Sequence, residues 1–132
     1  MSFRFLNHPG EVELAVDAAG ESEIYAEALR AFAELVGLDT GGHPEERHIR
    51  LEAPDRVSLL VDWLNELVYL ADIDGFVPDE IETMSLEGTR LDALVSGRLD
   101  AAPSSLVKAA TFSGATFERG ANGWRARIVL DV

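Results

Sequence analysis

The chain has 132 residues, enough for one domain with its own core, and we expect a single domain over residues 1–132. Apolar residues make up 47% of the chain and charged residues 27%, a composition typical of a folded globular protein. The absence of cysteine excludes thiol catalysis, zinc–thiolate sites, iron–sulfur clusters and disulfide scaffolds.

The net charge of −13 restricts the partners of this protein. A field of that sign repels phosphate backbones and anionic lipids, so we expect no tight binding to nucleic acid and no membrane association. It favours cations and basic protein surfaces, although acidity that serves only solubility is an equal alternative. The most apolar stretch, residues 57–73, is interrupted by polar side chains, and the sequence opens without a signal-peptide pattern. We therefore expect an intracellular, cytoplasmic protein.

The first quarter of the chain predicts two strands and a helix. A short strand at residues 4–7 precedes a strand at residues 12–17, where apolar and charged residues alternate. Ser22 is a candidate N-cap for a helix whose apolar stripe extends over residues 25–36, and Gly37 ends it.

The middle of the chain contains the strongest helical pattern. A loop at residues 41–44 and a strand at residues 48–53 precede a helix that starts at Asp55. Its apolar stripe is so wide that we expect burial on most of the circumference, against a sheet on one side and another element on the other. This helix is the expected centre of the fold, and Asp74-Gly75 ends it.

The rest of the chain predicts only strands, at residues 81–86, 91–99, 106–117 and 124–130. Asn122-Gly123 suits a tight hairpin between the last two strands. Two main helices and about six mostly antiparallel strands predict an α+β fold, a two-layer sandwich.

Several familiar sites are absent from the sequence. It has no phosphate-binding or dinucleotide-binding glycine motif, no HExxH and no GxSxG. We interpret the three histidines, at positions 8, 43 and 48, as surface groups rather than ligands. Residues 72–75 begin like a calcium loop but lack its later ligands, so a helix terminator is the better interpretation.

Carboxylates at the ends of two predicted strands form the first candidate site. Glu11 starts its strand on the charged face, Asp131 lies on the charged face of the last strand, and the α-carboxylate of Val132 adds an anion beside it. If these strands are neighbours, three carboxylates crowd one edge of the sheet and repel unless a cation binds or one is protonated. Oxygen ligands favour calcium or magnesium over zinc. The alternative is that these groups simply extend into water.

Lys108 is the second candidate, because it is the only lysine in a chain that otherwise uses arginine. Its compact ammonium is a point charge, unlike the planar guanidinium. The alternative is a stem that lies along apolar surface with its charge in water.

Five segments together resemble the archease family, and the similarity extends nearly end to end. They are residues 5–12, which are similar to its His-Thr-Ala-Asp-Val box; 25–32, similar to its first helix; 60–70, which contain its Asp-Trp-Leu-Asn-Glu-Leu block; 108–112, similar to its Lys-x-x-Thr segment; and 123–132, which end in Asp and an aliphatic residue.

The resemblance implies the archease fold and a non-catalytic accessory protein. Archeases assist RtcB-type ligases, which join 3′-phosphate and 5′-hydroxyl RNA ends in tRNA splicing and RNA repair, by promoting ligase guanylylation and turnover. The family binds a divalent cation at positions that match Glu11, Asp131 and Val132 here, and we expect this cation to be calcium, with magnesium or manganese as alternatives. Its lysine matches Lys108.

The chain departs from the family where Pro9-Gly10-Glu11 replaces Thr-Ala-Asp. Glutamate reaches one methylene further than aspartate, which predicts weaker cation binding. A general protein-interaction or chaperone module without a functional metal site is therefore the alternative. A metal-dependent hydrolase is disfavoured because no nucleophile and base lie at a recognisable spacing.

Overall fold

The structure, a computed structural model, describes residues 1–37, 41–100 and 107–132. In chain order the elements are β1 (Ser2–His8), β2 (Glu11–Ala18), α1 (Glu21–Val36), β3 (His43–Glu52), α2 (Arg56–Asp72), β4 (Phe76–Glu87), β5 (Arg90–Leu99), β6 (Ala109–Gly120) and β7 (Gly123–Asp131). The strands form two antiparallel sheets, ordered β1-β2-β7-β6 and β3-β5-β4. None of the helices in these described ranges is long and apolar enough to cross a membrane.

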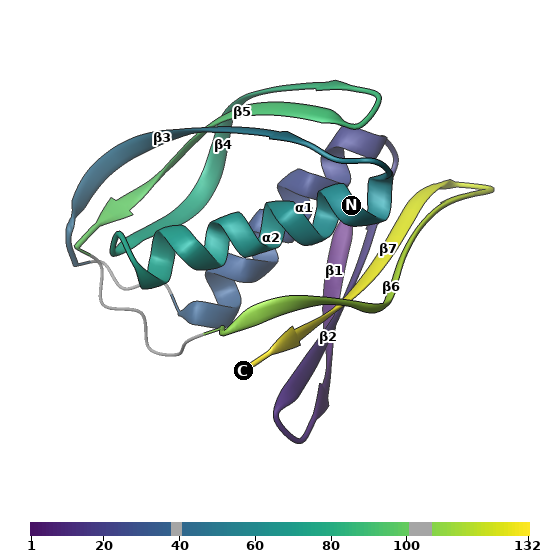
Figure 1. The fold of residues 1–132 in the computed structure, drawn as a ribbon, viewed down its shortest axis with the longest axis horizontal. Coiled ribbons are helices and arrows are strands. Elements are labelled where there is room, and N and C mark those ends of the chain that lie inside the picture. The colour runs from purple at the N-terminus through teal and green to yellow at the C-terminus, as the bar shows by residue number, and fades with distance from the viewer. Residues whose placement is uncertain (38–40, 101–106) are drawn as a thin grey trace.

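The helices lie between the two sheets (Figure 1). α2 contacts β6 of the four-stranded sheet and β3 and β4 of the three-stranded sheet, while α1 contacts β1, β2 and β7 as well as β4. The predicted α+β class, with two helices and antiparallel strands, is confirmed, but seven strands in two sheets take the place of the expected single layer of about six. The strands divide into two sheets because a helix that is apolar on nearly every side needs a cover on each.

Local signals account for most element boundaries. Asp55 caps α2 by accepting a hydrogen bond from the Ser58 N–H at 2.8 Å. Gly37 ends α1 with a φ of 73°. The N-cap prediction for Ser22 is wrong: the N-cap of α1 is Gly20, two residues earlier, in extended conformation and without a side-chain capping hydrogen bond.

The starts of β3, β4 and β6 differ from the sequence prediction. β4 begins at Phe76, five residues before the predicted start at residue 81. β3 begins at His43, inside the predicted loop, and accommodates Pro44 because β3 is an edge strand. β6 begins at Ala109, and residue 106, where its strand was predicted to begin, lies outside the described residues.

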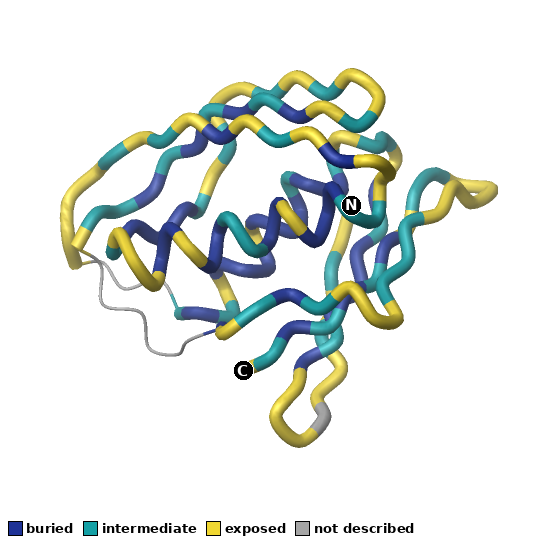
Figure 2. Tube along the Cα trace, viewed as in Figure 1, coloured by how far each residue is buried: buried dark blue, intermediate teal, exposed yellow. Residues whose placement is uncertain are grey.

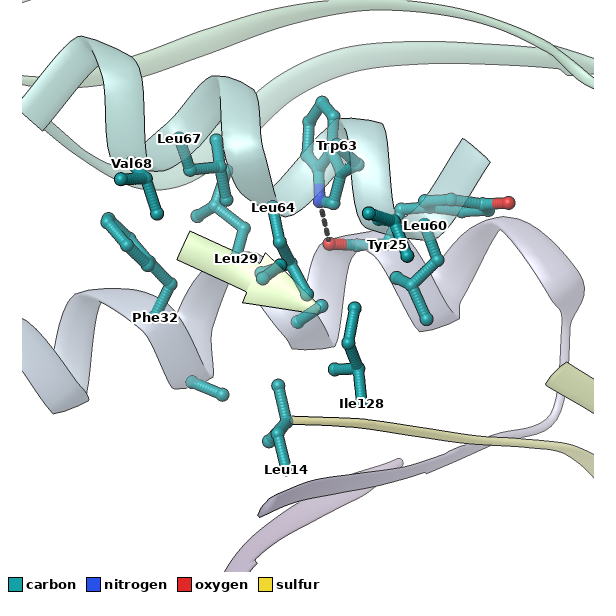
Figure 3. Packing of buried hydrophobic residues seen from close by; sticks show 14 of the residues in the cluster. Leu14, Tyr25, Leu29, Phe32, Leu60, Trp63, Leu64, Leu67, Val68 and Ile128 are labelled. Atoms are coloured by element: carbon teal, nitrogen blue, oxygen red, sulfur yellow. Dashed lines mark hydrogen bonds between the residues drawn. The ribbon is translucent and has the colours of Figure 1, made fainter. Parts of the chain in front are cut away.

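Helix α2 forms the centre of the core (Figure 2). The Trp63 and Leu64 side chains are fully buried. The Trp63 indole N–H donates to the Tyr25 carbonyl at 3.0 Å, and the Tyr25 ring meets the indole edge-on, so a hydrogen bond and an aromatic contact join the two helices (Figure 3). Leu64 lies opposite Leu14 and Ile128 of the four-stranded sheet (Figure 3).

Truncating the centre of α2 should therefore be costly. We expect Trp63→Ala and Leu64→Ala each to lower the free energy of unfolding by about 3–5 kcal/mol, because each leaves a cavity in a core that packs on both sides. Urea denaturation measures this. Asp62→Ala, on the exposed side of the same helix turn, should change stability by less than about 0.5 kcal/mol. Equal urea concentrations at the unfolding midpoint for all three variants would contradict the central position of α2 in the core.

Candidate functional site

Strands β2 and β7 are adjacent in the four-stranded sheet, and Glu11 lies directly opposite Asp131. The Val132 N–H donates to the Gly10 carbonyl at 3.1 Å, just beyond this pair. That bond makes Glu11 and Asp131 a non-hydrogen-bonded pair, whose Cα atoms are about 4.5 Å apart and whose side chains share one face. The register thus brings the three predicted metal-site residues, Glu11, Asp131 and Val132, to one end of the sheet.

The turn before Glu11 contributes to this arrangement. Pro9 and Gly10 form the two-residue connection between β1 and β2, with His8 opposite Glu11. Gly10 has a φ of 73°, which suits position i+2 of a type II turn after proline. A Cβ atom at Gly10 would meet nothing within 4 Å, so glycine is favoured by its backbone angle and not by space. The residues that replace the family's Thr-Ala thus build a turn whose carbonyl binds Val132.

The outer face of β2 and β7 carries charges that are paired everywhere except at this end. Glu13 pairs with Arg127 at 3.5 Å, and Asp17 pairs with Arg125 at 2.9 Å. Within the described ranges, Glu11 and Asp131 have no such cationic partner. Negative charge therefore accumulates at the Glu11–Asp131 end of the strands.

The donor set suits a hard cation only when the chain terminus takes part. Nowhere in the described residues do three or more His, Cys, Asp or Glu side chains converge as a metal site. Glu11 and Asp131 supply two carboxylates, and the predicted third ligand is a terminal carboxylate on Val132. Three carboxylates offer only oxygen ligands, which is the chemistry of calcium and magnesium.

Lys108 lies at the same end of the sheet. Its backbone N–H donates to the Asp131 carbonyl at 2.8 Å, and the next residue, Ala109, lies opposite Asp131 in the register. Its side chain is exposed. The sequence patterns did not place Lys108 near the carboxylates. The pairing of β6 with β7, which those patterns do not reveal, brings them together.

Asn65 is a positioning residue that the sequence analysis missed. Its side-chain amide donates to the Ala110 carbonyl at 3.3 Å, and its oxygen accepts from the Ala110 N–H at 2.8 Å. Asn65 therefore fixes β6 to α2 two residues after Lys108. The sequence signal that could have identified Asn65 is its polar amide, which lies among buried apolar positions of α2.

Two histidines occupy the surface, as predicted. His43 and His48 are exposed on the edge strand β3. The His48 ring and the Arg50 guanidinium both bind the Asp92 carboxylate on β5, and these hydrogen bonds lower the pKa of Asp92. This cluster lies on the other sheet from Glu11 and Asp131.

The Asn65 bridge generates a stability prediction. We expect Asn65→Ala to lower the free energy of unfolding by about 1–3 kcal/mol, because it leaves the Ala110 N–H and carbonyl without their partner. Amide hydrogen exchange at Ala110 should also become faster, and at Leu130 on the neighbouring strand it should change less. Unchanged exchange at Ala110 would show that α2 does not hold β6 through Asn65.

Comparison with known proteins supports the resemblance seen in the sequence. The model of the archease protein family matches residues 3–132. A protein archease from Methanosarcina mazei is 30% identical over 140 residues, which cover 98% of this chain and 95% of that protein. A protein archease from Archaeoglobus fulgidus is 30% identical over 138 residues, with 100% of both chains covered.

Two solved structures share the fold. The solution structure of Methanobacterium thermoautotrophicum protein 1598 has a TM-score of 0.70 at 21% identity, covering 99% of each chain. The crystal structure of a Thermotoga maritima protein described as an archease, possible chaperone, has a TM-score of 0.68 at 20% identity, covering 96% of this chain and 94% of that one. Together with the family match over nearly every residue, these likenesses show that the chain belongs to the archease family.

Proposed function

We propose that this protein activates an RtcB-type RNA ligase in the cytoplasm, promoting its guanylylation and turnover without catalysing ligation itself. The observation that carries the proposal is the single end of the four-stranded sheet where Glu11 lies opposite Asp131, with Val132 and Lys108 beside them. These are the positions at which the family's cation ligands and its lysine match this sequence.

In this proposal Glu11, Asp131 and the Val132 carboxylate hold a divalent cation, calcium before magnesium or manganese. A cation held there would offset the repulsion of the three anions and would supply a positive charge that can orient a nucleotide phosphate or a metal already in the ligase. Lys108 adds a compact point charge beside it. The longer Glu11 side chain predicts weaker binding than aspartate gives.

The overall charge supports encounter with such a ligase. A net charge of −13 attracts the basic surface that an RNA-binding enzyme presents, and it accelerates association at low salt. The same charge disfavours binding of the RNA itself. We therefore expect the partner to be the ligase and not its substrate.

A protein-interaction or chaperone module without a functional metal site remains the second candidate. The Glu11 substitution favours it, and so does the description of the Thermotoga maritima relative as a possible chaperone. In that case divalent cations would not change the melting temperature of this protein.

Loss of the carboxylate cluster tests the proposal. In a guanylylation assay with the RtcB-type ligase of the same genome, we expect the untagged protein plus calcium to accelerate ligase labelling. Asp131→Ala, or a short C-terminal extension that moves the Val132 carboxylate, should weaken calcium affinity on the order of tenfold, because each removes one anionic ligand. Calorimetry measures the affinity.

The matched controls are Glu13→Gln, one step along the same face, and an N-terminal extension of equal length. Both should keep calcium binding and activation. Calcium should raise the melting temperature of the unmodified protein by mass action, and Glu11→Asp should bind it more tightly. No effect of calcium on the untagged chain would favour the second candidate, and no effect of the protein on the ligase would contradict the proposed function.

The variant Lys108→Ala tests the role of the lysine separately from the role of the cation. The side chain is exposed, so stability should change by less than about 0.5 kcal/mol. Calcium affinity should stay equal or rise slightly, because a positive charge beside the cation is removed. We expect ligase activation to fall, with partial rescue by Lys108→Arg. Full activation by Lys108→Ala would return the residue to a surface role.

A further inference from the structure

Helix α2 leaves one stripe of its surface uncovered. Asp62, Glu66, Tyr69 and Ile73 follow one another at intervals of three or four residues, so they lie on one side of the helix. Tyr69 is 52% exposed and Ile73 is 63% exposed. The other sides of α2 are buried between the two sheets.

The edge strand β6 extends this stripe into a wider face. Asn65, on the border of the stripe, is bonded to Ala110, and Phe112 follows two residues later with 57% of its surface exposed. The pairing of β6 with β7 is interrupted between Thr111 and Thr116, which leaves Phe112 outside the regular ladder. We call the set Asp62, Glu66, Tyr69, Ile73 and Phe112 the α2–β6 face.

The acidic residues at the C-terminal end of α2 are electrostatically unfavourable for the helix by itself. α2 has no basic residue in its last turn, and Asp72 and Asp74 lie at its C-terminal end, where the helix dipole is already negative. Neither Asp62 nor Glu66 has an ion pair with any residue the structure describes. The arginines that pair with carboxylates do so on other elements or at the start of α2; they are Arg30, Arg47, Arg50, Arg56, Arg90, Arg125 and Arg127.

We propose that the α2–β6 face docks on a basic surface of the RNA ligase that has apolar pockets at its centre, as a contact additional to the carboxylate end. This inference rests on the proposed function. Aromatic side chains such as Tyr69 and Phe112 are frequent anchors of interfaces, and Asp62 and Glu66 provide the complementary charge. A second copy of this chain fits less well, because a symmetric contact would place the same acids against one another.

Figure 1 shows that α2 and β6 run in opposite directions. Since Asn65 is bonded to Ala110, Tyr69 lies towards the Lys108 end of β6 and Phe112 lies towards the Asp62 end of α2. The α2–β6 face therefore borders the end of the sheet that carries Lys108, and one ligase molecule can contact both.

Titration of ligase activation separates docking from chemistry. We expect the double variant Tyr69→Ser/Phe112→Ser to raise the concentration of this protein that gives half-maximal ligase activation about tenfold or more. The maximal activation should stay unchanged. Asp62→Asn/Glu66→Gln should raise this half-saturating concentration about three- to tenfold at low ionic strength and flatten its dependence on salt. Asp131→Ala should instead lower the maximal activation.

The controls remove similar groups from the other sheet. Leu94→Ser removes a half-buried apolar side chain from β5, and Glu46→Gln/Glu87→Gln removes two charges from β3 and β4. Both should match the unmodified protein in half-saturation. Circular dichroism and melting curves check folding, and the charge variant serves where the Tyr69/Phe112 variant is unstable.

Three outcomes are decisive. Half-saturation that shifts only in the face variants supports the inference. Unchanged half-saturation in the face variants, with normal activation by the unmodified protein, overturns it but leaves the proposed function intact. Self-association by light scattering that the face variants abolish would assign the face to a second copy and overturn ligase docking.

Discussion

Burial of α2 between two sheets is the constraint on which the rest of the structure depends. Leu59 and Val68 lie on opposite sides of α2 and both are buried, so one sheet cannot cover this helix, and the strands divide and enclose it. The same enclosure leaves only one narrow stripe of the helix exposed. It also requires the polar Asn65 to find partners at the border, and Ala110 on β6 supplies both of them.

The core also determines where the carboxylates lie. Leu14 and Ile128 face each other in the register and point inwards, so a slip of one residue between β2 and β7 would bring their charged neighbours into the core. The packing that fixes this register places Glu11 opposite Asp131. The crowding of like charges that results is an electrostatic cost, and the free energy of hydrophobic burial in the same strands offsets it.

Periodicity predicted the elements but not their pairing. The helices, the charged faces of Glu11 and Asp131 and the last hairpin follow from local patterns and turn chemistry. The turn of that hairpin consists of Ala121 and Asn122, one position before the predicted Asn122-Gly123. The order β1-β2-β7-β6 joins segments more than a hundred residues apart, and no local signal in β2 identifies β7 as its neighbour. The placement of Lys108 beside Asp131, the Asn65 bridge and the two separate sheets all depend on that long-range pairing.

Strand β6 connects the two surfaces of the proposed function. Lys108 precedes its first residue, Ala110 is bonded to α2 through Asn65, and Phe112 lies in the exposed face. A partner that contacts Phe112 and Tyr69 therefore binds a strand and a helix that two hydrogen bonds hold together, with Lys108 only two residues from those bonds. In the proposed function Lys108 acts on a phosphate, and rigid coupling of the docked α2–β6 face to the Lys108 end would reduce the entropy cost of placing that charge.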